Sequence, residues 1–430
     1  MEQRGKTLFW HRLDNTANLF PVVSDQRTPS VYRMTAELFE EVEPALLKEA
    51  VRVTLPWFPA FRVQLKRGFF WAYLEDNPAQ PKIFAEEGQP CRYIEPRKNR
   101  RFLFRILYFQ NRIHLEAFHA LTDGKGALMF LKAVCYQYLM RRYPQRFTPE
   151  QRSTVYGAEG AADVRDSYMS NYERMERRTF KEKKGFQFRG EKWPFGESAI
   201  VNYLIPADAL KETCRSLEAT VSQYLTAHLI WAAYTGVLCR HAPRQPFQVF
   251  LPVDLRKMFE SDSALNFFSN ILISLPLQEQ PVTFIGILEE VKRQFAQKMD
   301  KKEFQARLAY TAGSQKNMLI RCTPLCIKNL ILKTVYRMNS KGTSIPFSNL
   351  GLQQTEPLFA DYFKSFRAML GNCRIEPVTA TACTYRNCTV LTLSSVLQDT
   401  TLMRELARNL AADGLAVEIE TNHVLLEGEG

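Results

Sequence analysis

The sequence of 430 residues lacks any long hydrophobic run, any short-period repeat and any marked compositional bias. Its apolar and charged fractions, 46% and 24%, are those of an ordinary globular protein, which excludes a collagen, a coiled coil and a wholly disordered chain. The most apolar stretch, Leu225 to Cys239, contains His228 and is too short to span a bilayer. We therefore expect a core helix there and no transmembrane segment. Charged residues occupy several of the first 30 positions, so we also expect no signal peptide.

The cysteines also show no spacing that would indicate disulfide pairs. The nine cysteines are an odd number, and several of them lie within apolar stretches, which favours reduced thiols that pack as small hydrophobes. We therefore expect a cytoplasmic protein. Cys322 and Cys326 are spaced as CxxxC, but no second Cys or His pair lies near them, and we expect no metal site.

Acidic residues are outnumbered, with 45 Asp and Glu against 57 Lys and Arg and a net charge of +12. This excess favours an anionic partner, and nucleic acid, a membrane surface and a phosphorylated cofactor or carrier all fit it. No nucleic-acid-binding module is recognisable, so we expect no nucleic-acid partner. The basic run from Arg97 to Arg101 is either a solvated loop or a site that attracts phosphate groups.

Hydrophobic periodicity predicts strands that alternate with helices in both halves of the chain. In one predicted strand, 112–118, Ile113, Leu115 and Ala117 share a face, and His114 on the other face decorates the strand. The first half is predicted to contain a strand at 31–39, a helix from 44 to about 55, hairpins at 61–74 and 102–118, and a helix that has its apolar face at 128–139 and ends near Pro144.

A polar, highly charged stretch separates the two halves. The length allows two or three domains, and we predict an N-terminal lobe at 1–160, a connector at 161–197 and a C-terminal lobe at 198–430. The hairpins imply mixed sheets, so the predicted class is α/β or α+β with two similar lobes. The second half is predicted to contain strands at 199–205, 247–253, 270–277, 345–348, 377–385, 388–396 and 415–420, and helices after Pro206, at 222–240 with Ser222 as N-cap, at 282–299, and at 401–412 with Gly414 as C-cap.

The sharpest chemical signal is the segment HALTDG at 119–124, between a predicted strand and a predicted helix. This spacing of His, Asp and Gly is expected by chance on the order of 0.01 times in a chain with this many histidines. A turn after a strand exposes the imidazole of His119 to a cleft, and neutral His is the usual general base near pH 7. Asp123 can fix the turn by meeting a cation, and Gly124 lets the chain bend sharply. The alternative is a structural histidine.

The HxxxDG segment resembles the motif of the condensation-domain and BAHD acyltransferase superfamily, which includes chloramphenicol acetyltransferase, alcohol acetyltransferases and wax ester synthases. PVDLR at 252–256 is similar to that family's (V/P)NLR strand end, and Asn266 and Asn270 follow where relatives carry a short Asn motif. SNLG at 348–351 is similar to its SNxG element. The resemblance covers nearly the whole chain and is closest to bacterial-type alcohol O-acetyltransferases.

The resemblance implies two chloramphenicol-acetyltransferase-like lobes with an active-site tunnel between them. His119 would deprotonate a small alcohol or amine, which then attacks the thioester of acyl-CoA directly, so no cofactor is bound. Asp123 would be structural and would pair with Arg256 from the other lobe, holding the turn that contains Gly124.

Three further positions carry roles by resemblance alone. Asn270 would support the site. Ser348 or Asn349 would supply an oxyanion donor or position the pantetheine arm of the donor, unless the two residues simply form a turn.

Some family features are absent. Peptide-forming condensation domains usually carry a second His before the catalytic one, whereas Phe118 stands there in this chain, which favours ester formation without excluding amides. The DFGWG motif of plant enzymes is missing, and no carrier-protein, adenylation or thioesterase segment remains. We therefore expect a freestanding, monomeric O-acyltransferase. The alternatives are an amide-forming or carrier-protein-dependent condensation enzyme, and a catalytically silent binding protein with the same lobes.

Overall fold

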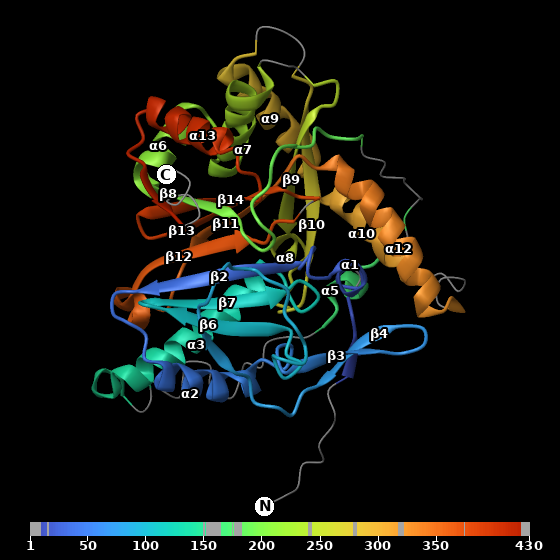
Figure 1. The fold of residues 1–430 in the computed structure, drawn as a ribbon, viewed down its shortest axis with the longest axis vertical. Helices are drawn as coiled ribbons and strands as arrows, with labels where there is room; N and C mark the ends of the chain where they lie inside the picture. Colours follow the sequence, from blue (N-terminus) through green and yellow to red (C-terminus); the bar gives the residue numbers. More distant parts are fainter. Residues whose placement is uncertain are drawn as a thin grey trace, which may run out of the picture.

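The computed structural model describes residues 10–14, 17–148, 151, 165–173, 175, 183–239, 243–277, 282–316, 322–373 and 375–422. The described strands form sheets of five, seven and three strands, with helices packed against them (Figure 1). Parallel pairs occur in the five-stranded and seven-stranded sheets, and the other pairs are antiparallel. This confirms the mixed α/β class.

The elements up to residue 170 build most of the lower half in Figure 1. In chain order they are β1 (Trp10–Arg12), α1 (Phe20–Val23), β2 (Val31–Leu38), α2 (Pro44–Thr54), η1 (Leu55–Trp57), β3 (Val63–Arg67), β4 (Ala72–Asp76), β5 (Ile83–Ala85), β6 (Phe104–Phe109), β7 (Arg112–Phe118), α3 (Gly124–Arg142), η2 (Pro144–Arg146) and α5 (Ser167–Ser170).

The elements after residue 198 build most of the upper half. They are β8 (Ala199–Pro206), α6 (Ala207–Ser216), α7 (Val221–Ala233), η3 (Tyr234–Leu238), β9 (Phe247–Asp254), α8 (Arg256–Phe259), β10 (Phe268–Leu275), α9 (Phe284–Lys298), α10 (Lys301–Lys316), α12 (Leu325–Asn339), η4 (Ser340–Gly342), β11 (Ile345–Gln353), η5 (Pro357–Tyr362), β12 (Phe363–Leu370), β13 (Val378–Tyr385), β14 (Cys388–Ser395), α13 (Thr401–Ala412) and β15 (Glu418–Thr421).

The first lobe is the five-stranded sheet, in the order β12-β2-β7-β6-β5, with α2 and α3 packed beneath it. Strand β12 comes from the second half of the sequence, yet it pairs antiparallel with β2. The sheets therefore do not divide at residue 198, because the second half of the chain supplies one strand of the first lobe. The predicted connector lies partly outside the described residues, at 161–164, 174 and 176–182.

The second lobe is the seven-stranded sheet, in the order β10-β9-β11-β13-β14-β8-β15, with α6, α7, α9 and α13 around it (Figure 1). Its buried side chains form one hydrophobic core, and those of the first lobe form another. Strands β9 and β10 run down toward the first lobe in Figure 1. They therefore bring the segment 254–268 against the end of β7.

The prediction that His114 decorates the strand was wrong. Its side chain is buried, and its imidazole contacts Thr35 at 2.8 Å and Glu86 at 3.4 Å. Alternation along β7 does place His114 on the other face of the strand from Ile113, but both faces of this strand are covered. Glu116 lies on the same second face and is fully buried, with Arg33 at 2.7 Å.

The start of α7 also differs from the prediction. Thr220 is the N-cap, and it forms a capping box with Gln223, in which each side chain meets the other residue's backbone N–H. The predicted cap, Ser222, lies inside the first turn. The helix ends at Ala233, where a π-helical turn follows. No helix within the described residues is long and apolar enough to cross a bilayer.

Candidate active site

His119 is the residue that follows the last residue of β7. Its backbone N–H donates to the carbonyl of Ser30 at 3.0 Å, so backbone pairing continues one residue beyond the β2–β7 ladder. The ring lies 4.8 Å from the ring of Phe20 in a stacked arrangement and 4.6 Å from the ring of Tyr32. Both contacts fix the plane of the imidazole.

The imidazole of His119 is held in its neutral form. Burial lowers its pKa from 6.5 to about 4, although the charge of Asp123 acts in the opposite direction. Nδ1 is buried and has no hydrogen-bond partner among the described residues, whereas the residue as a whole is partly exposed. This leaves Nε2 as the nitrogen that can meet a substrate.

Asp123 closes the turn and begins α3. Its Oδ1 accepts from the backbone N–H of Gly126 at 3.1 Å, so the carboxylate is the N-cap of the helix. Its Oδ2 accepts from the backbone N–H of Phe267 at 3.0 Å, which ties the turn to the segment before β10. With both oxygens occupied inside the protein, the carboxylate serves to hold structure.

Arg256 is the cation that meets Asp123. Its Nη2 lies 2.8 Å from Oδ2 and 3.0 Å from Oδ1 of that carboxylate, and the guanidinium is only 3% exposed. Nη1 donates to Asp254 at 2.9 Å, and Nε donates to the carbonyl of Ser263 at 2.9 Å. The pair thus joins the first lobe to the 254–268 segment of the second.

Two glycines let the turn pack closely. A side chain on Gly124 would meet Leu350 of β11 at 3.0 Å and Met34 of β2 at 3.1 Å. Gly126 is more tightly enclosed, because a β-carbon there would lie 2.1 Å from Oγ1 of Thr122 and 2.4 Å from the carbonyl oxygen of Ala264. The sequence indicated the first glycine and missed the second, whose neighbour Ala264 comes from far along the chain.

A buried carboxylate behind His119 was also missed. The amide of Asn266 donates to Oδ2 of Asp14 at 2.9 Å and to the backbone carbonyl of His119 at 3.2 Å. Oδ1 of Asp14 accepts from Ala17 N–H at 2.7 Å. Burial nevertheless raises the pKa of Asp14 to about 7. The sequence marks Asn266 only as part of the short Asn motif, and no local pattern marks Asp14.

The remaining predicted residues lie on two strands. Asn270 is partly buried in β10, two residues beyond Phe268, whose ring is 6.2 Å from that of His119. Asn349 donates to Ser222 Oγ at 2.9 Å and accepts from Gly351 N–H at 2.9 Å, so its amide supports the bulge of β11. Ser348 precedes it, partly buried, opposite Thr381.

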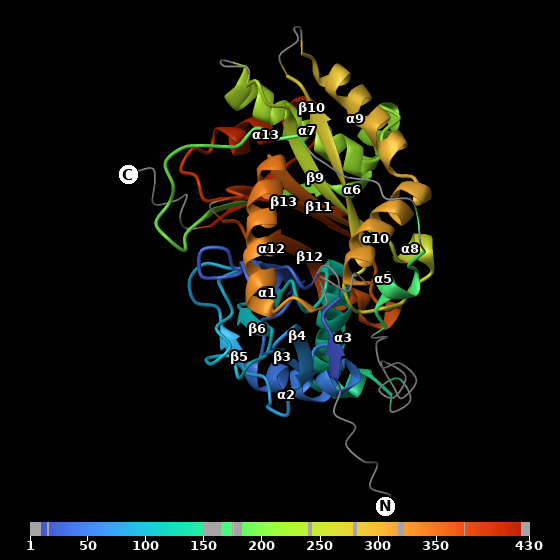
Figure 2. The ribbon, with the colours of Figure 1, turned by 90° about the vertical axis from the view of Figure 1, so that its right-hand side faces the viewer.

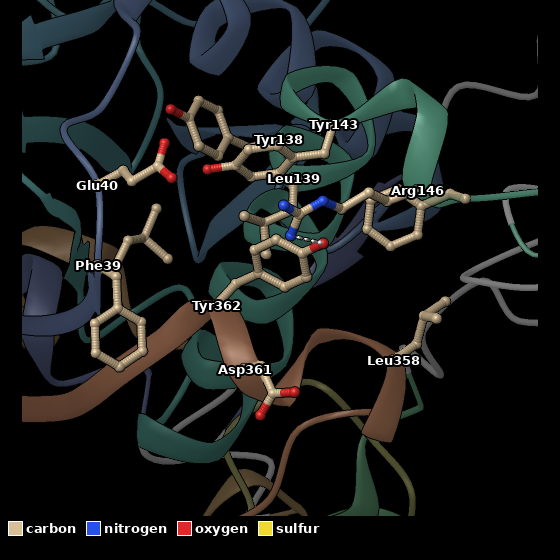
Figure 3. Close-up of a pocket in the computed structure, with 11 residues that line it drawn as sticks. Phe39, Glu40, Tyr138, Leu139, Tyr143, Arg146, Leu358, Asp361 and Tyr362 are labelled. Carbon is tan, nitrogen blue, oxygen red and sulfur yellow. Dashed lines mark hydrogen bonds between the residues drawn. The ribbon is translucent and has the colours of Figure 1, made fainter.

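Two pockets lie away from the imidazole. One, with a volume of about 450 Å³, is lined by Tyr138, Tyr143, Arg146 and Tyr362 at the far end of α3 (Figure 3). It contains none of the predicted site residues. The other, of about 280 Å³, lies between α1 and α12 and is lined by Leu19 and Val22, on either side of Phe20. Among the described residues, no cluster of His, Cys, Asp or Glu could hold a metal ion.

Comparisons with known proteins find similarity in structure alone. No family model matches the sequence, and no curated protein matches it. Trichothecene 15-O-acetyltransferase from Fusarium sporotrichioides has a TM-score of 0.62 at 10% identity, over 96% of this chain and 97% of that one. The wax ester synthase/diacylglycerol acyltransferase from Marinobacter aquaeolei VT8 has a TM-score of 0.54 at 12% identity, over 94% and 99%. The first condensation domain of the calcium-dependent antibiotic synthetase has 0.56 at 11% identity, over 94% and 96%.

The chain shares its two-lobed fold with these condensation domains and acyltransferases. The match extends over both lobes, since more than nine-tenths of each chain is aligned in these three comparisons. In this fold, the HxxxDG turn of the present chain lies where β7 of the first lobe meets the 254–268 segment of the second.

Proposed function

We propose that this protein is an acyltransferase that moves an acyl group from acyl-CoA to an alcohol, with His119 as the general base. The observation that carries the proposal is the environment of His119. A neutral imidazole is fixed by two aromatic rings at the end of β7, and the buried Asp123–Arg256 pair holds the turn that follows it. The superfamily fold, which it shares with an acetyltransferase and a wax ester synthase, supports acyl transfer.

In the proposed reaction, Nε2 of His119 takes the proton of the acceptor hydroxyl as its oxygen attacks the thioester carbonyl. The C–O bond forms, and the carbonyl electrons move onto oxygen. When the tetrahedral intermediate collapses, the C–S bond breaks and the thiolate leaves. The protonated imidazole then returns its proton to the sulfur. One base is sufficient, because no covalent bond to the enzyme is needed.

The low pKa of His119 supports this role in one respect. A base must be unprotonated when the substrate binds, and an imidazole whose pKa is about 4 is neutral throughout the physiological range. The negative charge that develops on the intermediate then stabilises the protonated imidazole as the reaction proceeds. Asp123 is a positioning residue in this account, since Arg256 and two backbone N–H groups occupy its oxygens.

The proposed acyl donor is a thioester of coenzyme A. A Fusarium sporotrichioides protein with a TM-score of 0.58, at 13% identity, was solved with coenzyme A and T-2. A starter condensation domain with a TM-score of 0.56, at 11% identity, was solved with C8-CoA and an aminoacyl thioester. The second comparison also has a coenzyme A thioester, and its second ligand favours an alternative in which the acceptor is an amine.

Ser348 is the residue we propose for the oxyanion or the pantetheine arm. Asn349 is less suited to the role, because Ser222 and Gly351 already engage its amide. Asn270 would line the site beyond Phe268. Ser348→Ala should therefore lower kcat, whereas Asn349→Ala should lower stability as well. The free energy of unfolding, measured with urea, separates the two effects.

The experiment that tests the function is a panel of acyl-CoA donors against alcohols and amines, followed by thiol release and by mass spectrometry of the product. An ester formed from acyl-CoA supports the proposal. An amide product, or activity only with an acyl carrier protein, selects the alternative. Saturable binding of acyl-CoA with no turnover for any acceptor would mean a silent binding protein.

A further inference from the structure

Helix α12 carries apolar side chains on its outer face as well as on its inner face. The inner face packs toward α1 and the β3–β4 hairpin and includes Leu332, which lines the pocket beside α1. The outer face exposes residues spaced by three and four positions, which fall on one side of a helix. They are Ile327, Leu330, Ile331 and Val335, with exposed fractions of 49%, 69%, 55% and 45%. Ile331 lies at the edge of this face, because it also lines the pocket beside α1.

The tip of the β3–β4 hairpin continues this surface. Phe69 and Phe70 are 70% and 43% exposed. The carbonyl of Phe69 accepts from the N–H of Leu325 at 2.9 Å, and the carbonyl of Phe70 accepts from Lys328 Nζ at 3.0 Å. The same ammonium group lies 3.5 Å from the centre of the Trp71 ring. The hairpin tip and α12 are therefore one contiguous unit.

The apolar side chains of this unit are surrounded by positive charge. Arg67 and Lys333 are exposed, and neither 66–72 nor 322–339 contains an Asp or a Glu. We call the six exposed apolar residues with these two cations the apolar-basic face. It gathers six of the seventeen large apolar side chains that are exposed in the described part of the chain, so it is more than the scatter found on any surface.

The face also protrudes. Figure 1 has α12 and the hairpin at the right-hand edge of the molecule, and Figure 2, in which this side faces the viewer, has α12 in front of the sheets with the hairpin beneath it. A protruding helix flank and hairpin tip can enter a lipid interface, where phenylalanine and branched side chains reach the acyl boundary and cations meet anionic headgroups.

We infer that the apolar-basic face docks this protein onto the surface of an anionic lipid membrane. The occupant follows from the charges: an acidic surface is required, and it must accept apolar side chains from two neighbouring elements at once. Docking would also place the pocket beside α1 next to the lipid. Leu19 and Val22, on either side of Phe20 in the sequence, line that pocket, and Phe20 stacks on His119.

The test is cosedimentation of the full chain with vesicles of phosphatidylcholine, with or without phosphatidylglycerol. The wild-type protein should bind the vesicles that contain phosphatidylglycerol, and added salt should weaken this binding. Leu330→Glu combined with Ile331→Glu should lower the partition coefficient at least about tenfold. Phe195→Glu is the matched control, because Phe195 is equally exposed at 70% and lies outside the face. It should change binding less than about twofold.

Two further variants make the result independent of folding and of catalysis. Phe69→Ser tests the hairpin tip if the helix variant unfolds at a lower temperature than the wild type, and it should also weaken binding. His119→Ala should bind as the wild type does, so docking and acyl transfer can fail separately. The inference would be overturned if the wild type bound both vesicle types equally, or if the face variants bound as well as the wild type. It would also be overturned if the protein did not bind vesicles and instead self-associated through this face, so that the face variants abolished the self-association.

Discussion

At the scale of single residues, the site depends on one imidazole whose neighbours keep it neutral and in place. His119 stacks on Phe20, lies against Tyr32, and has its backbone carbonyl held by Asn266. Because burial removes water from one side of the ring, the charged form is disfavoured. The residues around it therefore decide when the proposed base can act and where it points.

The pH dependence of the reaction reports this environment. The pKa of His119 is lowered to about 4, so the unprotonated base is present above that value and is lost as pH falls through it. We expect kcat/KM to stay level from pH 7 down to about 5 and to decline only near 4. Initial rates of thiol release across this range check the prediction. A decline centred near 6.5 would show an imidazole exposed to water.

The Asp123–Arg256 pair should respond as a unit to substitution. Asp123→Asn and Arg256→Ala each remove one charge of a buried ion pair, and each should lower the free energy of unfolding by about 3–5 kcal/mol. The double variant should cost less than the sum. Urea unfolding measures all three. Arg293→Ala, which breaks the exposed pair with Glu290, is the control and should cost less than about 1 kcal/mol. Strict additivity would contradict the contact.

Asp14 should make stability fall as pH rises. Its pKa is about 7 in the folded protein and 3.8 in the unfolded chain, so the native state binds the extra proton between these values. The contribution of this group to the free energy of unfolding is fully present below about pH 4, and it is lost as the pH rises from about 4 to about 7. Relative to Asp14→Asn, the free energy of unfolding of the wild type should fall by about 2–4 kcal/mol over that range.

Urea unfolding at several pH values tests the Asp14 prediction. The control is Asp361→Asn, which removes a carboxylate that is 93% exposed. That variant should keep the pH slope of the wild type. If Asp14→Asn also keeps the slope, the buried carboxylate does not titrate as its surroundings imply.

At the scale of elements, the turn between β7 and α3 is the feature that positions the site. Gly126→Ala should cost about 1–3 kcal/mol despite the higher helix propensity of alanine, because the added carbon would meet Thr122 and the Ala264 carbonyl. Gly313→Ala is the matched control within α10, where the nearest contact would be Tyr172 at 3.8 Å, and it should be neutral or stabilising by up to about 1 kcal/mol. Thermal unfolding compares the two. Equal effects would mean that the turn can relax.

Elements with strong local periodicity were predictable from the sequence. Strand β2 and helices α2 and α13 lie within two residues of their predicted bounds. Strand β12 was missed, because Arg367 interrupts its apolar pattern. In the structure that arginine is buried and pairs with Glu37 at 2.6 Å and with Glu420. Its partner strand β2 lies more than 300 residues away, so no local signal marks the pairing.

The same limit applies to the site. The HxxxDG segment could be found because its residues are neighbours in the sequence, and the contact between Asp123 and Arg256 could be expected only through a resemblance. Phe20 and Asp14 could not be found, since both come from the N-terminal segment, about 100 residues away. Phe20 contacts His119 directly, and Asp14 is linked to it through Asn266. Spacing along the chain carries no information about such contacts.

At the scale of the whole molecule, the lobes are joined at the place where the chemistry is proposed. Arg256, Asn266 and Phe267 of the second half all bond to the HxxxDG turn of the first. Strand β12 crosses in the other direction and completes the first sheet. The site is therefore intact only when both lobes are in contact, and a separate N-terminal lobe would lack three of its supports.

The most direct measurement is the rate of thiol release from acyl-CoA with the best alcohol, for the wild type and for His119→Ala. The account predicts a fall of about a hundredfold to ten-thousandfold in kcat/KM, with an unchanged unfolding temperature and unchanged binding of acyl-CoA. An unchanged rate in a folded His119→Ala protein would contradict the claim that this histidine is the base.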